Sequence, residues 1–133
     1  MSTITTQSPT AVVEGFYEAL GRGDIAEVTR LCSPDMTMSN PGSSPLAGLY
    51  IGRDAIRGFL GKMQEAARGT FHAELRSVYA NGSSVIATHH GTATRDDKTL
   101  DVEAALLFTV EDGIVTSVVS HQSAQDTWDS FFS

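Results

Sequence analysis

The spacing of apolar residues changes once along this chain of 133 residues, and that change limits the folds it can adopt. Before about residue 70, apolar residues recur at i, i+3, i+4 and i+7, as in Val13, Phe16, Tyr17 and Leu20. This is the pattern of a helix with one buried face. From Thr70 onward, apolar residues recur at every second position, which is the pattern of strands. Helices followed by a sheet predict an α+β domain.

Three helices are expected before the strands begin. The first starts at the capping Ser8 and the proline after it, and two glycines end it after residue 20. The second starts at a capping box formed by Asp24 and Glu27. The third follows Gly52 and carries apolar residues at positions 56, 59, 60 and 63.

A short strand and a loop separate the second and third helices. Residues 36–39 alternate between methionine and hydroxyl side chains, which predicts a strand, and residues 40–45 are rich in turn-forming residues. Turn sequences at 81–82, 96–97 and 112–113 then divide the rest of the chain into four strands, which predicts an antiparallel meander. One face of the third of these strands is apolar, and we expect it to lie under the helices; it comprises Leu100, Val102, Ala104, Leu106, Phe108 and Val110.

One domain is expected over residues 9–133, preceded by a flexible N-terminus over residues 1–8. A chain of 133 residues suits a single core, and a hydrophobic share of 41% is enough to form it. Residues 1–10 lack the basic start and apolar centre of a signal peptide, and no later apolar run is long enough to span a membrane. We therefore expect a cytoplasmic protein.

The charge balance argues against several kinds of partner. Nine Lys and Arg against sixteen Asp and Glu give a formal net charge of −7, so neither a nucleic acid nor a membrane is an expected partner. Cys32 is the only cysteine, which excludes an intrachain disulfide and a zinc site with several thiolates. His89 and His90 are adjacent and point to opposite faces of a strand, so they do not share a metal ion. We expect neither a metal nor a cofactor.

The order of these elements and several short motifs resemble the SnoaL-like branch of the NTF2-like superfamily. The motifs are Phe16-Tyr17, Gly23-Asp24, Asn40-Pro41-Gly42, Pro45-Leu46-Ala47-Gly48, Gly52-Arg53-Asp54-Ala55-Ile56, Gly69-Thr70-Phe71, Gly91-Thr92-Ala93-Thr94-Arg95 and Asp112-Gly113. The resemblance covers nearly the whole chain. It implies an NTF2-like cone, in which N-terminal helices pack in a strongly curved antiparallel or mixed sheet that encloses a pocket. It also implies a two-fold homodimer through the outer face of the sheet.

Members of this superfamily catalyse several reactions, and their catalytic residues do not transfer intact to this chain. The aspartate base of the ketosteroid isomerases looks replaced by Asn40, whose amide cannot take up a proton near neutral pH. The polarising phenol and the protonated acid of those enzymes would fall near Phe16 and Ala104. The histidine and aspartate of the SnoaL-like aldol cyclases would fall at Leu106 and Ser120. The Asp-Arg-Asp relay of the related epoxide hydrolases is also incomplete.

Three residues are the candidate catalytic groups: His90, Asn40 and His121. By the resemblance, the side chains facing the pocket from two strands would be Ile86, Thr88, His90, Thr92, Val118, Ser120 and Gln122. His90 would then serve as the base, because an imidazole titrates near neutral pH. A strand histidine without a catalytic role is the alternative, and with His89 adjacent the register can differ by one. His121 would turn inward only at a bulge, and it otherwise faces outward onto a subunit interface.

The expected pocket is lined mostly by apolar side chains. Candidate ligand-binding residues are Phe16, Tyr17, Met36, Met38, Tyr50, Phe59, Met63, Leu106, Ser120, Gln122 and Trp128. Core packing explains the same apolar stripes equally well, and Trp128 can anchor the C-terminal tail instead of capping the pocket. The leading hypothesis is that a small apolar molecule, polyketide-like or another secondary metabolite, is cyclised or isomerised by positioning with weak acid–base help. The alternative is a non-catalytic ligand-binding or dimeric interaction module.

Overall fold

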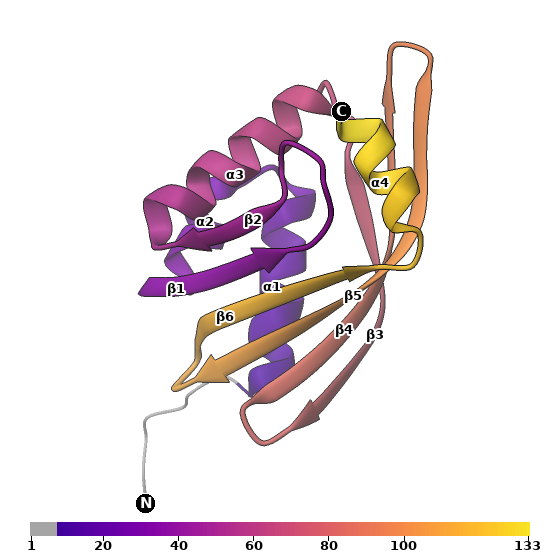
Figure 1. Ribbon diagram of the computed structural model, residues 1–133. Helices are drawn as coiled ribbons and strands as arrows, with labels where there is room; N and C mark the ends of the chain where they lie inside the picture. Colours follow the sequence, from indigo (N-terminus) through magenta and orange to yellow (C-terminus); the bar gives the residue numbers. More distant parts are fainter. Residues whose placement is uncertain (1–7) are drawn as a thin grey trace, which may run out of the picture.

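The computed structural model describes residues 8–133, and within them the chain forms four helices and six strands (Figure 1). In chain order they are α1 (Pro9–Gly21), α2 (Ile25–Arg30), β1 (Cys32–Asn40), β2 (Gly48–Ile51), α3 (Arg53–Ala66), β3 (His72–Asn81), β4 (Ser84–Arg95), β5 (Lys98–Glu111), β6 (Ile114–Gln122) and α4 (Gln125–Phe132). None of these helices is long and apolar enough to cross a membrane. The flexible N-terminus expected over residues 1–8 lies almost entirely outside the described residues.

The strands form one sheet in the order β2-β1-β6-β5-β4-β3. All neighbours are antiparallel except β1 and β6, which are parallel, so the sheet is mixed. The predicted meander is confirmed as β3 to β6. Figure 1 shows a strongly curved sheet with α1 crossing its concave side, where α1 contacts β3, β4, β5 and β6. The core therefore lies between the helices and the concave face, as the predicted α+β class requires.

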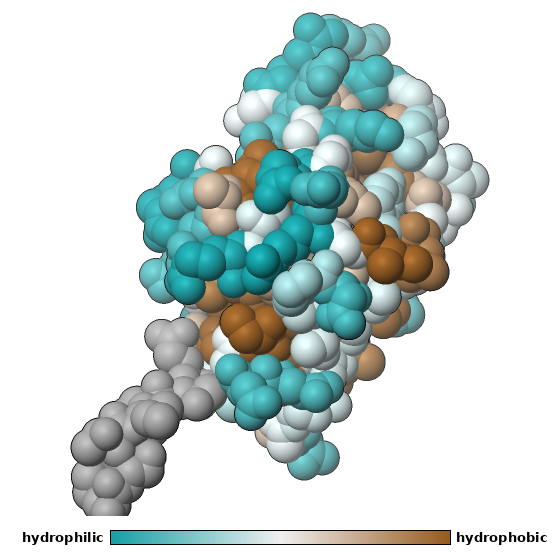
Figure 2. All heavy atoms as spheres, turned by 90° about the vertical axis from the view of Figure 1, so that its left-hand side faces the viewer, coloured by the Kyte–Doolittle hydropathy of each residue, from teal (hydrophilic) through white to brown (hydrophobic). Residues whose placement is uncertain are grey.

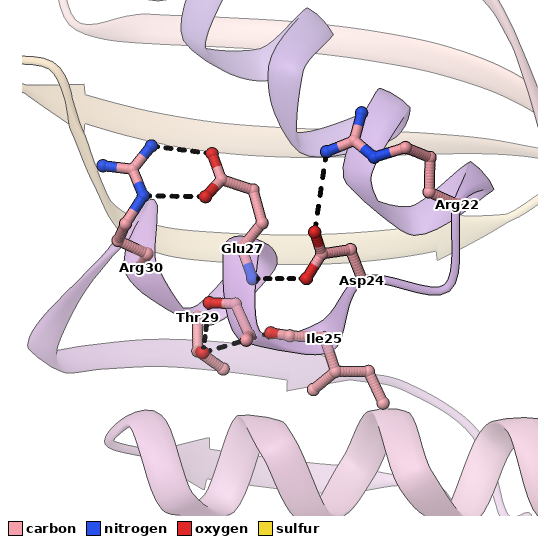
Figure 3. Close-up of polar contacts among 7 residues, drawn as sticks. Arg22, Asp24, Ile25, Glu27, Thr29 and Arg30 are labelled. Atoms are coloured by element: carbon pink, nitrogen blue, oxygen red, sulfur yellow. Dashed lines mark hydrogen bonds and ion pairs between the residues drawn. The ribbon is translucent and has the colours of Figure 1, made fainter.

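The start of α2 is fixed by Asp24, as the sequence predicts (Figure 3). Asp24 Oδ1 accepts a hydrogen bond from the backbone N–H of Glu27 at 3.0 Å, which satisfies one free donor at the helix start. The other half of the capping box is not formed, because the Glu27 carboxylate pairs with Arg30 at 2.6 and 2.7 Å. The backbone N–H of Asp24 instead donates to the Ala19 carbonyl at 2.9 Å. This bond joins the start of α2 to the last turn of α1.

The segment between α2 and α3 is more regular than the sequence predicts. The strand expected over residues 36–39 spans Cys32–Asn40, so Pro34 lies inside a strand. Proline has no N–H to donate, and the pairing of β1 with β6 is irregular around Pro34, between Cys32 and Thr37. The short edge strand β2, which the sequence analysis does not predict, pairs antiparallel with β1.

β4 turns inward the face opposite to the one expected. Its buried residues are Val85, Ala87, His89, Gly91 and Ala93, whereas Ile86, Thr88, His90 and Thr92 are more exposed. Directly paired residues of neighbouring strands lie on the same face of a sheet, and His89 pairs with Ala104. Ala104 belongs to the apolar face predicted for β5 and is buried. His89 is therefore inside, and the prediction of an inward His90 is wrong by one residue.

α4 closes one end of the curved sheet, where it contacts β5 and β6. The C-terminal tail thus forms a helix with three buried aromatic side chains. Asp129 Oδ1 accepts a hydrogen bond from the Ser44 backbone N–H at 3.2 Å, which attaches α4 to the loop after β1. Gly42 in that loop has a φ of +102°, and a Cβ there would overlap side chains of α4. The positive φ and the close approach to α4 thus both favour glycine at this position.

Candidate functional site

A small cavity lies between the helices and the concave face of the sheet, with a volume of about 60 Å³. It is lined by Phe16, Tyr17, Leu20, Met38, Asn40, Phe59, Leu60, Met63, Phe71, Ala73, His89, Leu106, Ser120, Gln122 and Trp128. Most of these side chains are apolar, and the few polar ones come from α1, from the middle of β4 and from the ends of β1 and β6. An apolar cavity with a few convergent polar groups is typical of small-molecule sites.

Tyr17 and His89 form the central polar contact of the cavity. The Tyr17 hydroxyl lies 2.6 Å from His89 Nδ1, and both side chains are buried. This contact joins α1, on the concave side of the sheet, to the middle of β4, across 72 positions of the sequence. The rings also meet edge to face, with centroids 5.3 Å apart.

Both groups are uncharged at neutral pH. Burial, and then the neighbouring His90, lowers the pKa of His89 from 6.5 to about 4. Burial also raises the pKa of Tyr17 above its ordinary value of 10.0. The phenol thus keeps its proton, and Nδ1 of the neutral imidazole is the acceptor within its reach. We therefore assign the imidazole proton to Nε2, which has no hydrogen-bond partner among residues 8–133.

Two buried amide atoms in the cavity wall have no hydrogen-bond partner among the described residues. They are Nδ2 of Asn40, at the end of β1, and Oε1 of Gln122, at the end of β6. Asn40 is 8% exposed, and Ser120, which also lines the cavity, is 6% exposed. An unpartnered buried polar group costs about 1–3 kcal/mol. Water or a ligand in the cavity can remove this cost, so these atoms are candidate contacts for a bound molecule.

The cavity as it stands is small. Its 60 Å³ is less than half the volume of an apolar cavity of roughly 150 Å³ that binds benzene. Met38 and Met63 form part of its wall, and methionine side chains have several rotatable bonds that allow them to rearrange. Binding of a ring compound therefore requires movement of these side chains.

Most of the predicted site residues line this cavity. They are Asn40 among the candidate catalytic groups and Phe16, Tyr17, Met38, Phe59, Met63, Leu106, Ser120, Gln122 and Trp128 among the ligand-binding candidates. Trp128 also packs on Phe71 and Phe132, with ring centroids 6.2 and 4.6 Å away, so it anchors α4 as well as lining the cavity. The roles of these residues in binding stay predictions.

Two ligand-binding candidates lie elsewhere. Met36 is fully buried in the core and does not reach the cavity. Tyr50 packs on Phe59, with ring centroids 5.0 Å apart, and its hydroxyl donates to the Leu46 carbonyl at 2.9 Å. Tyr50 thus supports the cavity wall through Phe59.

Two candidate catalytic histidines also lie outside the cavity. His90 is on the outer face of the sheet, where its Nε2 lies 2.5 Å from Asp101 Oδ1 and 3.8 Å from Glu103 Oε2. His121 is exposed. The bulge in β6 occurs near its start, between the pairs of Thr109 and Val110, so it does not turn His121 inward. His89, expected to face outward, takes the inner position instead.

The register of β4 is the signal that could have identified His89. The apolar face of β5 is evident in the sequence, and a meander pairs β4 with β5, so a residue count through the 96–97 turn places His89 opposite Ala104. Leu20, Leu60, Phe71 and Ala73 also line the cavity and are not among the ligand-binding candidates, because periodicity shows which face is buried but not which buried residues border a cavity.

A larger, open depression of about 730 Å³ lies elsewhere on the surface and shares no residue with the cavity. It contains Lys62, Glu65, Arg68 and Arg95. Arg68 already pairs with Asp96, and Arg95 donates to the carbonyls of Phe131 and Ser133. Because both arginines already have partners and Lys62, Glu65 and Arg68 are exposed, we place the candidate site in the smaller cavity. Within residues 8–133, no cluster of His, Cys, Asp and Glu has the arrangement of a metal site.

Known proteins match this chain over most of its length. Residues 13–118 match the family model of the SnoaL-like domain. The uncharacterised protein Rv0034 of Mycobacterium tuberculosis (strain ATCC 25618 / H37Rv) is 33% identical over 130 residues, which are 97% of this chain and 99% of that protein. The structure of Bal32a, from a soil-derived mobile gene cassette, is 32% identical with a TM-score of 0.90 and covers 94% of this chain and 96% of its own. A candidate polyketide cyclase from Xanthomonas campestris pv. campestris is 27% identical with a TM-score of 0.72, over 94% of this chain and 96% of its own.

The buried His89 makes stability depend on pH. Its folded-state pKa of about 4 lies below the ordinary 6.5, so the unfolded chain binds the extra proton first as the pH falls. The free energy of unfolding should therefore drop between about pH 6.5 and pH 4, by up to about 3 kcal/mol from this group. Urea denaturation at several pH values measures the drop.

The variant His89→Gln should lose this part of the pH dependence, because glutamine does not titrate. His90→Gln, one residue along the same strand and on the outer face, should retain it. Equal pH dependence in wild type and His89→Gln would contradict the assignment of a neutral buried imidazole.

Proposed function

The chain belongs to the family of SnoaL-like domains, and on this premise we propose that its cavity binds a small, largely apolar molecule and isomerises or cyclises it. A polyketide-like or other secondary metabolite is the substrate class that we favour. The likeness to a candidate polyketide cyclase supports this class, since that protein shares the fold and 27% of its sequence with this chain.

The single observation that carries the proposal is the polar cluster inside an apolar cavity. Asn40 Nδ2 and Gln122 Oε1 are buried without partners among the described residues, and the Tyr17–His89 pair lies in the same wall. A cavity that served only for packing would gain stability from apolar side chains at these positions. The cluster is therefore better explained as a set of contacts for a bound molecule.

Enolisation of a ketone is the chemistry that these groups suit. The N–H groups of His89 and Asn40 donate to the ketone oxygen of the substrate. A proton leaves the adjacent carbon for water, the C–H electron pair forms a C=C bond, and the carbonyl π electrons move to the oxygen, which the two donors stabilise. A proton returned to another carbon isomerises the substrate, and attack of the enolate carbon on a second carbonyl closes a ring.

A neutral imidazole is suited to this role. Its N–H donates to the developing oxyanion without a charge of its own, as neutral histidine does in other enolising enzymes. The role of base first predicted for His90 does not carry over to His89, because His89 has its pKa lowered to about 4. The site then relies mainly on positioning, which can lower a barrier by about 7–11 kcal/mol.

A non-catalytic binding module is the second candidate function. The observation that favours it is that none of the described lining residues is Asp, Glu, Lys or Arg, so the cavity has no strong acid or base. The two functions share the binding site and differ in whether the bound molecule reacts.

Exchange of ketone protons with solvent separates the two functions. We expect the protein to accelerate the incorporation of deuterium beside the carbonyl of 4-hydroxycyclohexanone in D2O. Proton NMR measures the rate. His89→Phe should lower the increase in exchange rate over that in buffer at least about tenfold, because the enolate oxygen loses one hydrogen-bond donor. His90→Gln is the matched control and should retain the increment. A ketone that binds but exchanges at the buffer rate would contradict catalysis and favour the binding module.

We also propose that two copies associate through the outer face of the sheet. A row of paired outward residues crosses all six strands, and it comprises Tyr79, Ile86, Leu107, Val119, Ser39 and Leu49. Tyr79, Ile86, Leu107 and Leu49 are among the exposed large apolar residues of the protein. Figure 2 shows one face of the molecule, on which apolar areas interrupt a mainly polar surface. Exposed apolar rows of this kind favour association with a second copy.

The cytoplasmic location stays a prediction.

The variant Leu107→Glu should convert the proposed dimer to a monomer, because it places a charge in the middle of the row. Thr99→Glu, exposed on the same strand but outside the row, should leave the dimer intact. Light scattering after size-exclusion chromatography measures the mass. A monomeric wild type, or a Leu107→Glu variant that stays dimeric, would overturn the proposed interface.

A further inference from the structure

The walls of the cavity contain no charge that could pair with an ion. Tyr17 and His89 are the only ionisable groups among its described lining residues, and they bond to each other. Burial keeps both of them neutral near pH 7, with the pKa of Tyr17 raised and that of His89 lowered to about 4. The formal net charge of −7 makes the surroundings less favourable still for an anion. An ionised ligand would have to leave water for a site without a counter-charge, which is unfavourable.

The unpartnered atoms have opposite hydrogen-bonding character. Asn40 Nδ2 is a donor and Gln122 Oε1 is an acceptor, and both atoms are buried. Asn40 and Gln122 lie at the same end of two neighbouring parallel strands, β1 and β6, in which Ser39 pairs with Val119. Both therefore face the cavity from one side of its wall.

Water competes with any ligand for these atoms. A volume of about 60 Å³ exceeds the roughly 10–15 Å³ that a cavity needs to hold a water molecule. A ligand that displaces ordered water and does not reproduce its hydrogen bonds loses affinity. Affinity at this site therefore depends on matching both amides and not on apolar contact alone.

We propose that the cavity selects uncharged molecules that offer a hydrogen-bond acceptor to Asn40 and a hydrogen-bond donor to Gln122, which is the pattern of a neutral hydroxy-ketone. This inference rests on the proposed function and specifies its substrate. The carbonyl binds at Asn40 and the hydroxyl binds at Gln122, while His89 lines the same cavity. Carboxylates of the same size are excluded by their charge, and purely apolar rings leave both amides unpaired.

Two matched pairs of ring compounds test charge and hydrogen bonding separately. The first pair is 4-oxocyclohexanecarboxamide and 4-oxocyclohexanecarboxylate, which have nearly the same shape but differ in charge. The second pair is 4-hydroxycyclohexanone and 4-methoxycyclohexanone, of which only the first can donate to Gln122. Methylcyclohexane is the apolar probe. Titrations followed by the side-chain amide NMR signals of Asn40 and Gln122 report both the location and the affinity of each probe.

We expect the neutral or hydroxylated member of each pair to bind at least about tenfold more tightly than its partner, with both amide signals shifting. In Gln122→Met the preference for the hydroxyl over the methoxy compound should disappear, with the two compounds binding about equally, because methionine accepts hydrogen bonds only weakly. In Asn40→Leu all ketone probes should weaken, whereas methylcyclohexane should not. Asn81→Leu, an exposed asparagine of β3, is the matched control and should bind like wild type.

The outcomes separate this inference from the proposed function. Equal binding of the members of either pair, or tighter binding of the carboxylate, would overturn the inference. If methylcyclohexane binds in the cavity as tightly as the ketones, the result supports the proposed apolar site and contradicts its selectivity for hydroxy-ketones. If no probe shifts a signal from the cavity, both proposals fall.

Discussion

The hydrogen bond between Tyr17 and His89 is the contact on which the rest of the site depends. It joins α1 to β4 inside the curved sheet, over a distance of 2.6 Å and between two buried side chains. Because the partners come from the first helix and the middle of the meander, the bond adds a directional contact to the apolar packing of α1 on the concave face. It also occupies Nδ1 of the imidazole, which leaves the second ring nitrogen for the cavity.

The absence of charge among the described cavity residues follows from the same arrangement. Burial on the concave face favours the uncharged forms of Tyr17 and His89, and the acids near His90 are all on the outer face. Burial of Asn40 Nδ2 and Gln122 Oε1 lowers the stability of the protein, because neither atom has a hydrogen-bond partner among the described residues. Binding sites commonly carry such costs, because groups that recognise a ligand cannot also be satisfied by the fold.

The sequence predicts the architecture well and the site less well, for physical reasons. Near both ends of β5, over residues 100–103 and 108–111, apolar and polar residues alternate, so its buried face is clear. In β4 both faces carry small or polar residues, from Ala87 to Thr92, so local periodicity cannot choose between His89 and His90. Only the pairing of β4 with β5 shows that His89, and not His90, faces inward. Met36 and Met38 share a face, as predicted, but only Met38 reaches the cavity, because depth along a strand is set by the packing of the helices.

The tautomer and charge of His89 are the properties from which the chemistry of the cavity follows. Nitrogen-15 NMR of the imidazole, recorded from pH 7.5 down to pH 4.5, measures both directly. The account predicts a neutral ring with its proton on Nε2 over most of this range, because the folded-state pKa of His89 is about 4. A ring protonated near pH 6.5, or a neutral ring with its proton on Nδ1, would contradict it.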